Sequence, residues 1–199
     1  MQQVTGMLRT VPPWLIYLGG AAWATFLFWQ GATGRMGPEP IKALEHAYGE
    51  AALIALLAGL AITPLRRFLG LNLLRFRRAV GLTAFFFVVC HVLVWAVLDV
   101  QSVQRVWADI LRRPYITVGM AGLALLLPLA MTSNNRALRW LGPRWRQLHR
   151  LTYPAVFLAA VHFVMLRKGL QAEPMIYLLG TCLLLALRFL KRASRGKAA

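Results

Sequence analysis

Six long apolar stretches constrain the fold of this sequence more than any other feature. Each is long enough for an α-helix to cross the hydrocarbon core of a bilayer, about 30 Å thick. They cover approximately Trp14–Gln30, Ala47–Thr63, Val80–Leu98, Tyr115–Met131, Leu151–Met165 and Met175–Leu190. The mean hydropathy is +0.58, and no internal repeat or second domain is visible. The sequence therefore predicts an all-α polytopic membrane protein, with one bundle of six transmembrane helices as the single domain of residues 1–199.

Basic residues are distributed unevenly between the two sets of loops. Of the 23 Lys and Arg residues, 16 lie in the N-terminal segment, the 65–79 and 132–150 loops and the tail from Arg188. The other seven, with all six acidic residues, lie on the opposite side of the membrane in this arrangement. The positive-inside rule then predicts that both termini are cytoplasmic. The net charge of +17 is explained by this topology and by contact with anionic lipid, so we expect no nucleic-acid partner.

The first apolar stretch is expected to remain as a helix. A signal peptide would have a basic N-terminal segment and a small-residue cleavage site. This stretch has no basic residue before it beyond Arg9 and no convincing cleavage site after it. Prolines mark three expected helix boundaries, at Pro64, Pro114 and Pro174. Two more, Pro128 and Pro154, lie within stretches, where neighbouring helices can satisfy the freed carbonyls.

Two connecting segments have patterns of their own. In Ser102–Arg113, apolar residues recur with helical spacing, which predicts an amphipathic helix on the outer face. Membrane anchoring is the favoured role of this helix, and a dock for a soluble periplasmic partner is the alternative. On the inner face, residues 66–78 mix arginine with apolar side chains. This pattern favours an interfacial segment on anionic lipid, or alternatively a site for a phosphate-bearing or quinone ligand.

Histidines are the main polar residues inside the apolar stretches. His91 and His162 each lie 11 residues, or about 16 Å, from the inner end of their stretches, so they are level in the membrane. A neutral imidazole is a good axial ligand of haem iron. We therefore expect the two to bind one b-type haem. His46, at the outer start of the second stretch, is expected to be an ordinary hydrogen-bonded residue.

His149 lies about 20 Å closer to the cytoplasm than His162 and would suit a second haem. On an ideal helix, however, the two side chains point about 140° apart, unless Pro154 bends the helix. The expected partner position on the third stretch holds Arg77 and Arg78, which cannot ligate iron. With Arg75 they are predicted to hold a haem propionate, a flavin phosphate or a quinone oxygen.

The cysteines argue against covalent haem. Cys90 and Cys182 lie in different apolar stretches, and no CxxCH motif exists. We expect both to act as buried small hydrophobic residues.

Several motifs carry a family resemblance over nearly the whole chain. They are Pro38–His46, Ile62–Arg66, Arg77–Leu82, Arg113–Gly119, Thr132–Ser133 and Leu141–Tyr153, the last followed by His162. The sequence resembles the haem-binding membrane subunits of the bacterial periplasmic protein-methionine-sulfoxide reductase system. It is similar, more widely, to the ferric-reductase-like transmembrane domains of NADPH oxidases and metalloreductases. Those domains carry two histidines on each of two helices, whereas here an arginine, Arg77 or Arg78, occupies the fourth position.

The resemblance implies an electron-transfer subunit in the bacterial inner membrane, without catalytic residues of its own. Such a subunit takes electrons from the quinone pool or a cytoplasmic flavin reductase. It passes them through haem to a periplasmic molybdopterin subunit that reduces methionine sulfoxide. The resemblance also implies FMN binding and maps His91, His149 and His162 onto haem positions; one haem is expected, and a second is left open. The alternatives are a stand-alone ferric reductase and a transporter or assembly factor without redox chemistry.

Overall fold

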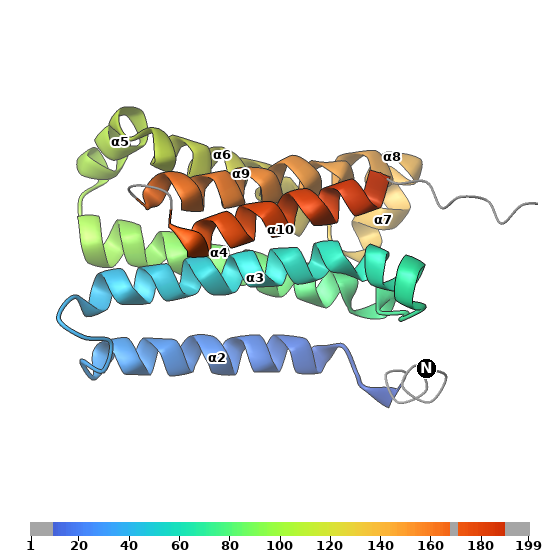
Figure 1. The fold of residues 1–199 in the computed structure, drawn as a ribbon, viewed down its shortest axis with the longest axis horizontal. Coiled ribbons are helices and arrows are strands. Elements are labelled where there is room, and N and C mark those ends of the chain that lie inside the picture. Colours follow the sequence, from blue (N-terminus) through green and yellow to red (C-terminus); the bar gives the residue numbers. More distant parts are fainter. Residues whose placement is uncertain (1–9, 168–170, 190–199) are drawn as a thin grey trace, which may run out of the picture.

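The computed structural model describes residues 10–167 and 171–189, and every regular element in these ranges is helical. The longer helices lie side by side along one axis (Figure 1). They are α2 (Trp14–Ala32), α3 (Pro40–Leu69), α4 (Arg77–Leu93), α6 (Pro114–Met131), α9 (Thr152–Leu166) and α10 (Ala172–Phe189). Each contains most of one predicted apolar stretch, so the all-α bundle is confirmed for the described residues.

Four helical stretches in the described part of the chain are long and apolar enough to cross a membrane. They are Pro40–Leu69, Leu74–Val100, Pro114–Met131 and Pro143–Leu166. The helices α2 and α10 fall outside this set, although α2 contains no charged residue. The prediction of a helical membrane fold is therefore confirmed, and four of the six expected spans satisfy the criteria of length and composition.

Shorter elements connect the long helices. They are a 3₁₀ turn (Leu74–Phe76), a π-helical turn (Val94–Val100), α5 (Val103–Arg112), α7 (Asn135–Leu141), α8 (Pro143–Leu148) and a second 3₁₀ turn (His149–Leu151). Helix α5 coincides with the predicted amphipathic helix, and none of its residues is buried. Its exposed large apolar side chains, Val103, Trp107 and Leu111, follow the i, i+4, i+8 spacing of one helix face.

The prolines correct one predicted boundary. Pro114 opens α6 as predicted, and Pro174 lies in the first turn of α10. The prediction for Pro64 was wrong, because α3 continues through it to Leu69. Proline has no N–H, so it frees the carbonyl four residues earlier, at Leu60. The Arg188 Nε donates a hydrogen bond of 3.1 Å to that carbonyl, which explains how the helix tolerates the proline.

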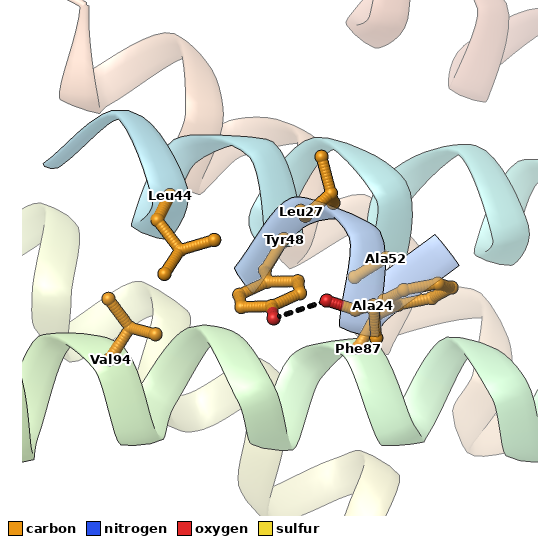
Figure 2. Packing of buried hydrophobic residues seen from close by; sticks show 7 residues of the cluster. All are labelled: Ala24, Leu27, Leu44, Tyr48, Ala52, Phe87 and Val94. Carbon is orange, nitrogen blue, oxygen red and sulfur yellow. Dashed lines mark hydrogen bonds between the residues drawn. The ribbon is translucent and has the colours of Figure 1, made fainter. Parts of the chain in front are cut away.

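Helix α2 is joined to the bundle by one buried cluster. Ala24 and Leu27 of α2 pack on α3 and α4 residues, as Figure 2 shows. The Tyr48 hydroxyl of α3 donates a 2.8 Å hydrogen bond to the Ala24 carbonyl. A buried hydroxyl needs such a partner, and the alanines let the helix backbones come close. This contact fixes the position of α2 beside α3.

A second apolar cluster joins the other helices at mid-bundle. It consists of Leu56, Leu60, Ala84, Leu126, Leu129, Ala155 and Val156, from α3, α4, α6 and α9. The basic connections, including α7 and α8, gather at one end of the bundle, and α5 lies at the other (Figure 1). The charge asymmetry of the sequence is thus an asymmetry between the two ends of the molecule.

Candidate functional site

His91 of α4 is held against the backbone of α3. Its Nδ1 lies 2.9 Å from the Glu45 carbonyl oxygen. A carbonyl only accepts hydrogen bonds, so Nδ1 carries the hydrogen and the Nε2 lone pair is left for a ligand. The ring lies over Gly49, where a Cβ atom would come within 3.1 Å of Nδ1.

His162 of α9 repeats this arrangement on α6. Its Nδ1 lies 2.7 Å from the Tyr115 carbonyl oxygen. The ring lies over Gly119, where a Cβ atom would come within 2.9 Å of Nδ1. The Nε2 lone pair of this histidine is therefore also available.

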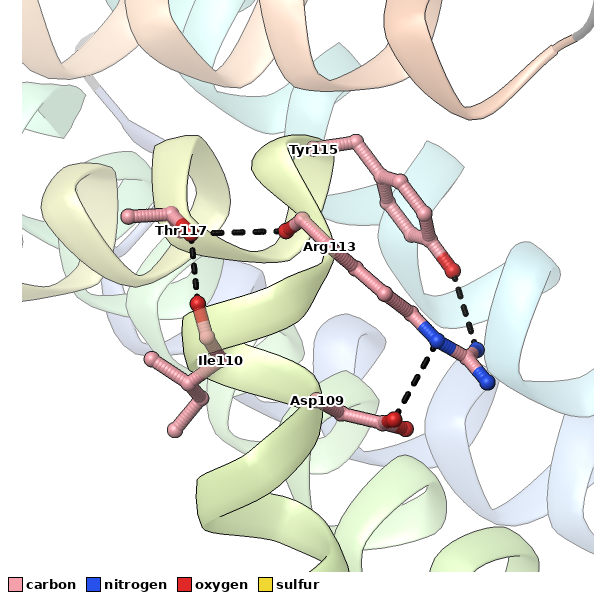
Figure 3. A network of polar contacts seen from close by, with 5 residues as sticks. All are labelled: Asp109, Ile110, Arg113, Tyr115 and Thr117. Atoms are coloured by element: carbon pink, nitrogen blue, oxygen red, sulfur yellow. Dashed lines mark hydrogen bonds and ion pairs between the residues drawn. The ribbon is translucent and has the colours of Figure 1, made fainter.

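The start of α6, which carries Tyr115, is fixed by a polar network with α5 (Figure 3). The Arg113 Nε lies 3.1 Å from an Asp109 carboxylate oxygen, and an Arg113 amino group donates a 3.3 Å hydrogen bond to the Tyr115 hydroxyl. The Thr117 hydroxyl donates to the Ile110 carbonyl. Hydrogen bonding to the Tyr115 hydroxyl is the main reason that the pKa of Arg113 is raised above its ordinary value. The network ties the α5–α6 corner to the turn that holds His162.

The two imidazoles face one cavity. Their ring centroids are 6.2 Å apart and their planes are inclined by 77°. The cavity has a volume of about 320 Å³ and is lined by α3, α4, α6 and α9, with His46 also in its wall. Two metal–nitrogen bonds of about 2 Å, with about 1 Å from each nitrogen to its ring centre, span about 6 Å. The two imidazoles are therefore far enough apart to hold one metal ion between them, which would suit a haem iron bound by two histidines.

Ionisable side chains stand around this outer cavity. Lys42, Glu45 and Glu50 of α3 line it, with Asp99 of the π-helical turn and Arg113. The Tyr177 hydroxyl of α10 donates a 2.9 Å hydrogen bond to a Glu50 carboxylate oxygen. Because α3 begins at Pro40, His46 lies inside this helix and not at its start. The outer cavity thus combines two imidazoles with several ionisable side chains in its wall.

A second, inner cavity of about 570 Å³ opens at the basic end of the bundle. It brings His149 together with the predicted Arg75, Arg77 and Arg78. Three further arginines, Arg146, Arg150 and Arg188, line it, and no Asp or Glu is among its lining residues in the described part of the chain. Such a wall attracts an anionic group, since arginine binds carboxylates and phosphates with its paired N–H donors.

The position of His149 differs from that of an ideal continuous helix. A 3₁₀ turn, His149–Leu151, separates α8 from α9, so the 140° angle computed for one straight helix does not apply. The ring stacks on Trp145, with centroids 3.8 Å apart. Its Nε2 lies 3.2 Å from the Thr132 hydroxyl. His149 is thus a hydrogen-bonded wall residue of the inner cavity.

Leu56 and Leu126 line both cavities, so the mid-bundle apolar cluster separates them. His91 and His162 lie on one side of it and His149 on the other. Within residues 10–167 and 171–189, no group of three or more His, Cys, Asp and Glu side chains could share a metal ion. The three histidines therefore form a pair and a separate single residue.

Sequence reasoning missed three residues of these sites. Gly49 and Gly119 lie under the two histidines, and a glycine inside an apolar helix was the available signal. Arg188 was assigned to the C-terminal tail, but it lies in α10 and reaches into the bundle. Besides the Leu60 carbonyl, it donates to Tyr153 and Thr63 hydroxyls at 2.9 and 2.8 Å.

Comparison with known proteins gives one consistent result. The family model "Ferric reductase like transmembrane component" matches residues 44–160. Proteins of Brucella ovis, Brucella canis and Brucella suis are each 48% identical over 165 residues, covering 82% of this chain and 75% of theirs. Each is called "Protein-methionine-sulfoxide reductase heme-binding subunit MsrQ". No solved structure matches the chain.

Proposed function

Since the chain belongs to the MsrQ family, within the ferric-reductase-like transmembrane components, we propose that it is the membrane haem b subunit that supplies electrons to a protein-methionine-sulfoxide reductase. The observation that carries the proposal is the His91–His162 pair, with centroids 6.2 Å apart in one cavity. A bound haem b would supply one-electron chemistry by alternating between ferric and ferrous iron.

His91 and His162 are the residues that would hold the haem iron. Each is held by a hydrogen bond from Nδ1 to a backbone carbonyl, which fixes the tautomer and the ring orientation that a ligand needs. In both cases the acceptor is an uncharged backbone carbonyl, which suits a neutral imidazole as the ligand. Lys42 and Arg113, which line the outer cavity, have the charge to pair with haem propionates.

We assign electron entrance to the inner cavity. His149, Arg75, Arg77 and Arg78 would hold an anionic or polar redox group there: a second haem by its propionates, FMN by its phosphate, or a quinone by its oxygens. The excess of arginine over acid in this wall supports an anionic group. The electron donor is the quinone pool or a cytoplasmic flavin reductase. Leu56 and Leu126, which line both cavities, would lie between the redox group of the inner cavity and the haem of the outer cavity.

The membrane arrangement follows from the charge distribution. We propose six spans in the bacterial inner membrane, with both termini and the basic end of the bundle cytoplasmic. The outer cavity then lies towards the periplasm, where a molybdopterin-containing catalytic subunit accepts the electrons. The chain itself holds no proposed residue for sulfoxide chemistry, so it serves as the electron-transfer subunit in the repair of oxidised periplasmic proteins.

The test is a quantitative pyridine haemochrome assay with absorption spectra of the purified protein. Wild type should contain haem b, and His91→Ala and His162→Ala should each abolish the outer-haem spectrum. His46→Ala, which alters a wall residue with no proposed bond to iron, serves as the comparison. An unchanged Soret band in both ligand variants would reject the ligand pair. A colourless wild-type protein would favour a transporter or assembly factor instead.

A further inference from the structure

We infer that Gly49 and Gly119 are positioning residues that open two helix carbonyls to the imidazoles of His91 and His162. This inference rests on the proposed haem function and assigns to the glycines the orientation of both ligands. Each glycine lies four residues after the residue whose carbonyl accepts the histidine hydrogen bond: Glu45 precedes Gly49, and Tyr115 precedes Gly119.

The spacing of four residues has a physical reason. In an α-helix, the N–H of residue i+4 already bonds to the carbonyl of residue i. The side chain of residue i+4 points back towards the preceding turn and covers the flank of that carbonyl. An imidazole that reaches the carbonyl across residue i+4, as the rings of His91 and His162 do, therefore needs that residue to have no Cβ. The glycine and the histidine hydrogen bond are two parts of one arrangement.

The distances support this explanation at both positions. A Cβ on Gly119 would meet the Nδ1 and Cε1 atoms of His162 at 2.9 and 3.0 Å. A Cβ on Gly49 would meet the same atoms of His91 at 3.1 and 3.3 Å. These contacts are closer than ordinary van der Waals separation, and they involve the nitrogen that makes the hydrogen bond. An alanine at either position would push the ring away from the carbonyl.

Gly122 shows that close helix packing is a different role. One turn further along α6, a Cβ on Gly122 would meet Leu158 and the α9 backbone at 3.7–4.0 Å, which is ordinary contact. Gly122 thus lies at the α6–α9 contact without touching a histidine. Gly49 and Gly119 differ because the nearest atoms belong to the imidazole rings.

The arrangement occurs twice, once on the α3–α4 pair and once on the α6–α9 pair. In both copies the carbonyl accepts a hydrogen bond from Nδ1, and this contact leaves Nε2 on the side of the ring away from the supporting helix. The two copies therefore orient two Nε2 atoms about one cavity. A hydrogen bond from the distal nitrogen of a metal-bound histidine also raises its basicity as a ligand.

The experiment compares Gly49→Ala and Gly119→Ala with Gly19→Ala and Gly180→Ala, whose added Cβ atoms would meet nothing within 4 Å. All four changes raise helix propensity alike, so the controls account for that effect. Haem titration of the haem-depleted protein in detergent should show affinity lowered about 10–100-fold in the first two variants. The loss should be larger for Gly119→Ala, and the low-spin ferric EPR signal of any bound haem should shift in both.

Wild-type haem affinity and an unchanged EPR signal in Gly49→Ala and Gly119→Ala would overturn the inference. Should Gly119→Ala fail to fold, Gly49→Ala, with its longer contacts, decides the question. A role in helix packing alone would lower the unfolding temperature and leave the EPR signal unchanged, which also counts against the inference. The proposed function fails separately, through a wild-type protein without haem or haem that persists in His91→Ala and His162→Ala.

Discussion

The imidazole planes of His91 and His162 are inclined by 77° across the outer cavity, with centroids 6.2 Å apart. Each plane is set by its own hydrogen bond, to the carbonyl of Glu45 or of Tyr115. These carbonyls belong to different helices, Glu45 to α3 and Tyr115 to α6, so each ring is oriented by its own pair of helices. The near-perpendicular arrangement is therefore a property of the protein scaffold.

The ferric protein should give a strongly anisotropic low-spin EPR signal. If both imidazoles held the haem iron at this angle, they would act on different iron d orbitals and leave these orbitals nearly equal in energy, whereas parallel rings would separate them. Low-temperature EPR of the purified wild-type protein measures this directly. A rhombic signal typical of parallel rings would contradict the near-perpendicular orientation of the His91 and His162 planes.

Replacing both Arg77 and Arg78 by alanine should slow reduction of the outer haem without removing it. The two arginines line the inner cavity and lie outside the outer one. Stopped-flow reduction by quinol or by reduced flavin measures the rate, and the absorption spectrum checks the haem. The matched control is Arg136→Ala with Arg139→Ala, because these exposed residues lie at the same end and line neither cavity. Wild-type rates in the Arg77/Arg78 variant would reject the entrance assignment.

Pro64 and Arg188 should be energetically coupled through the Leu60 carbonyl. In Arg188→Leu this carbonyl loses its partner, at a cost of about 1–3 kcal/mol. In the Pro64→Ala background, the N–H of the alanine can bond to the same carbonyl, so Arg188→Leu should cost less there. A double-mutant cycle of unfolding free energies in detergent measures the coupling. Additive effects would show that Arg188 does not replace the missing N–H.

Tyr48→Phe should lower the unfolding free energy by about 0.5–1.5 kcal/mol while preserving the haem spectrum. The substitution leaves the buried Ala24 carbonyl without its side-chain donor and weakens the attachment of α2. Tyr48 does not line the outer cavity, so the haem site should be unaffected. Tyr17→Phe, on the exposed face of α2, is the control. Equal unfolding curves for the two variants would show that the Tyr48 contact contributes little.

Several features of the fold and of the site could be predicted from the local pattern of the sequence. Apolar length located the six long helices, and helical spacing located α5. Equal distance from the inner ends of two stretches brought attention to His91 and His162, whose rings lie in one cavity. These properties depend on residues close together along the chain and on the constant rise of a helix, so they can be read without knowledge of the packing.

Other features depended on contacts between helices. Only the tertiary structure placed Arg188 beside the carbonyl freed by Pro64, and this contact lets α3 continue where the sequence predicted its end. The 3₁₀ turn at His149 likewise changed an angle derived from a straight helix.

The sequence by itself determined a basic, apolar helical bundle with histidines at matched depth. The tertiary structure decided which backbone carbonyl each histidine bonds to. It also placed Gly49 and Gly119 where the absence of a Cβ leaves room for the two imidazole rings. The physical reason is that hydrophobic length and charge act segment by segment. The rotation and register of one helix against another, in contrast, are set by side chains that meet only after the bundle has packed.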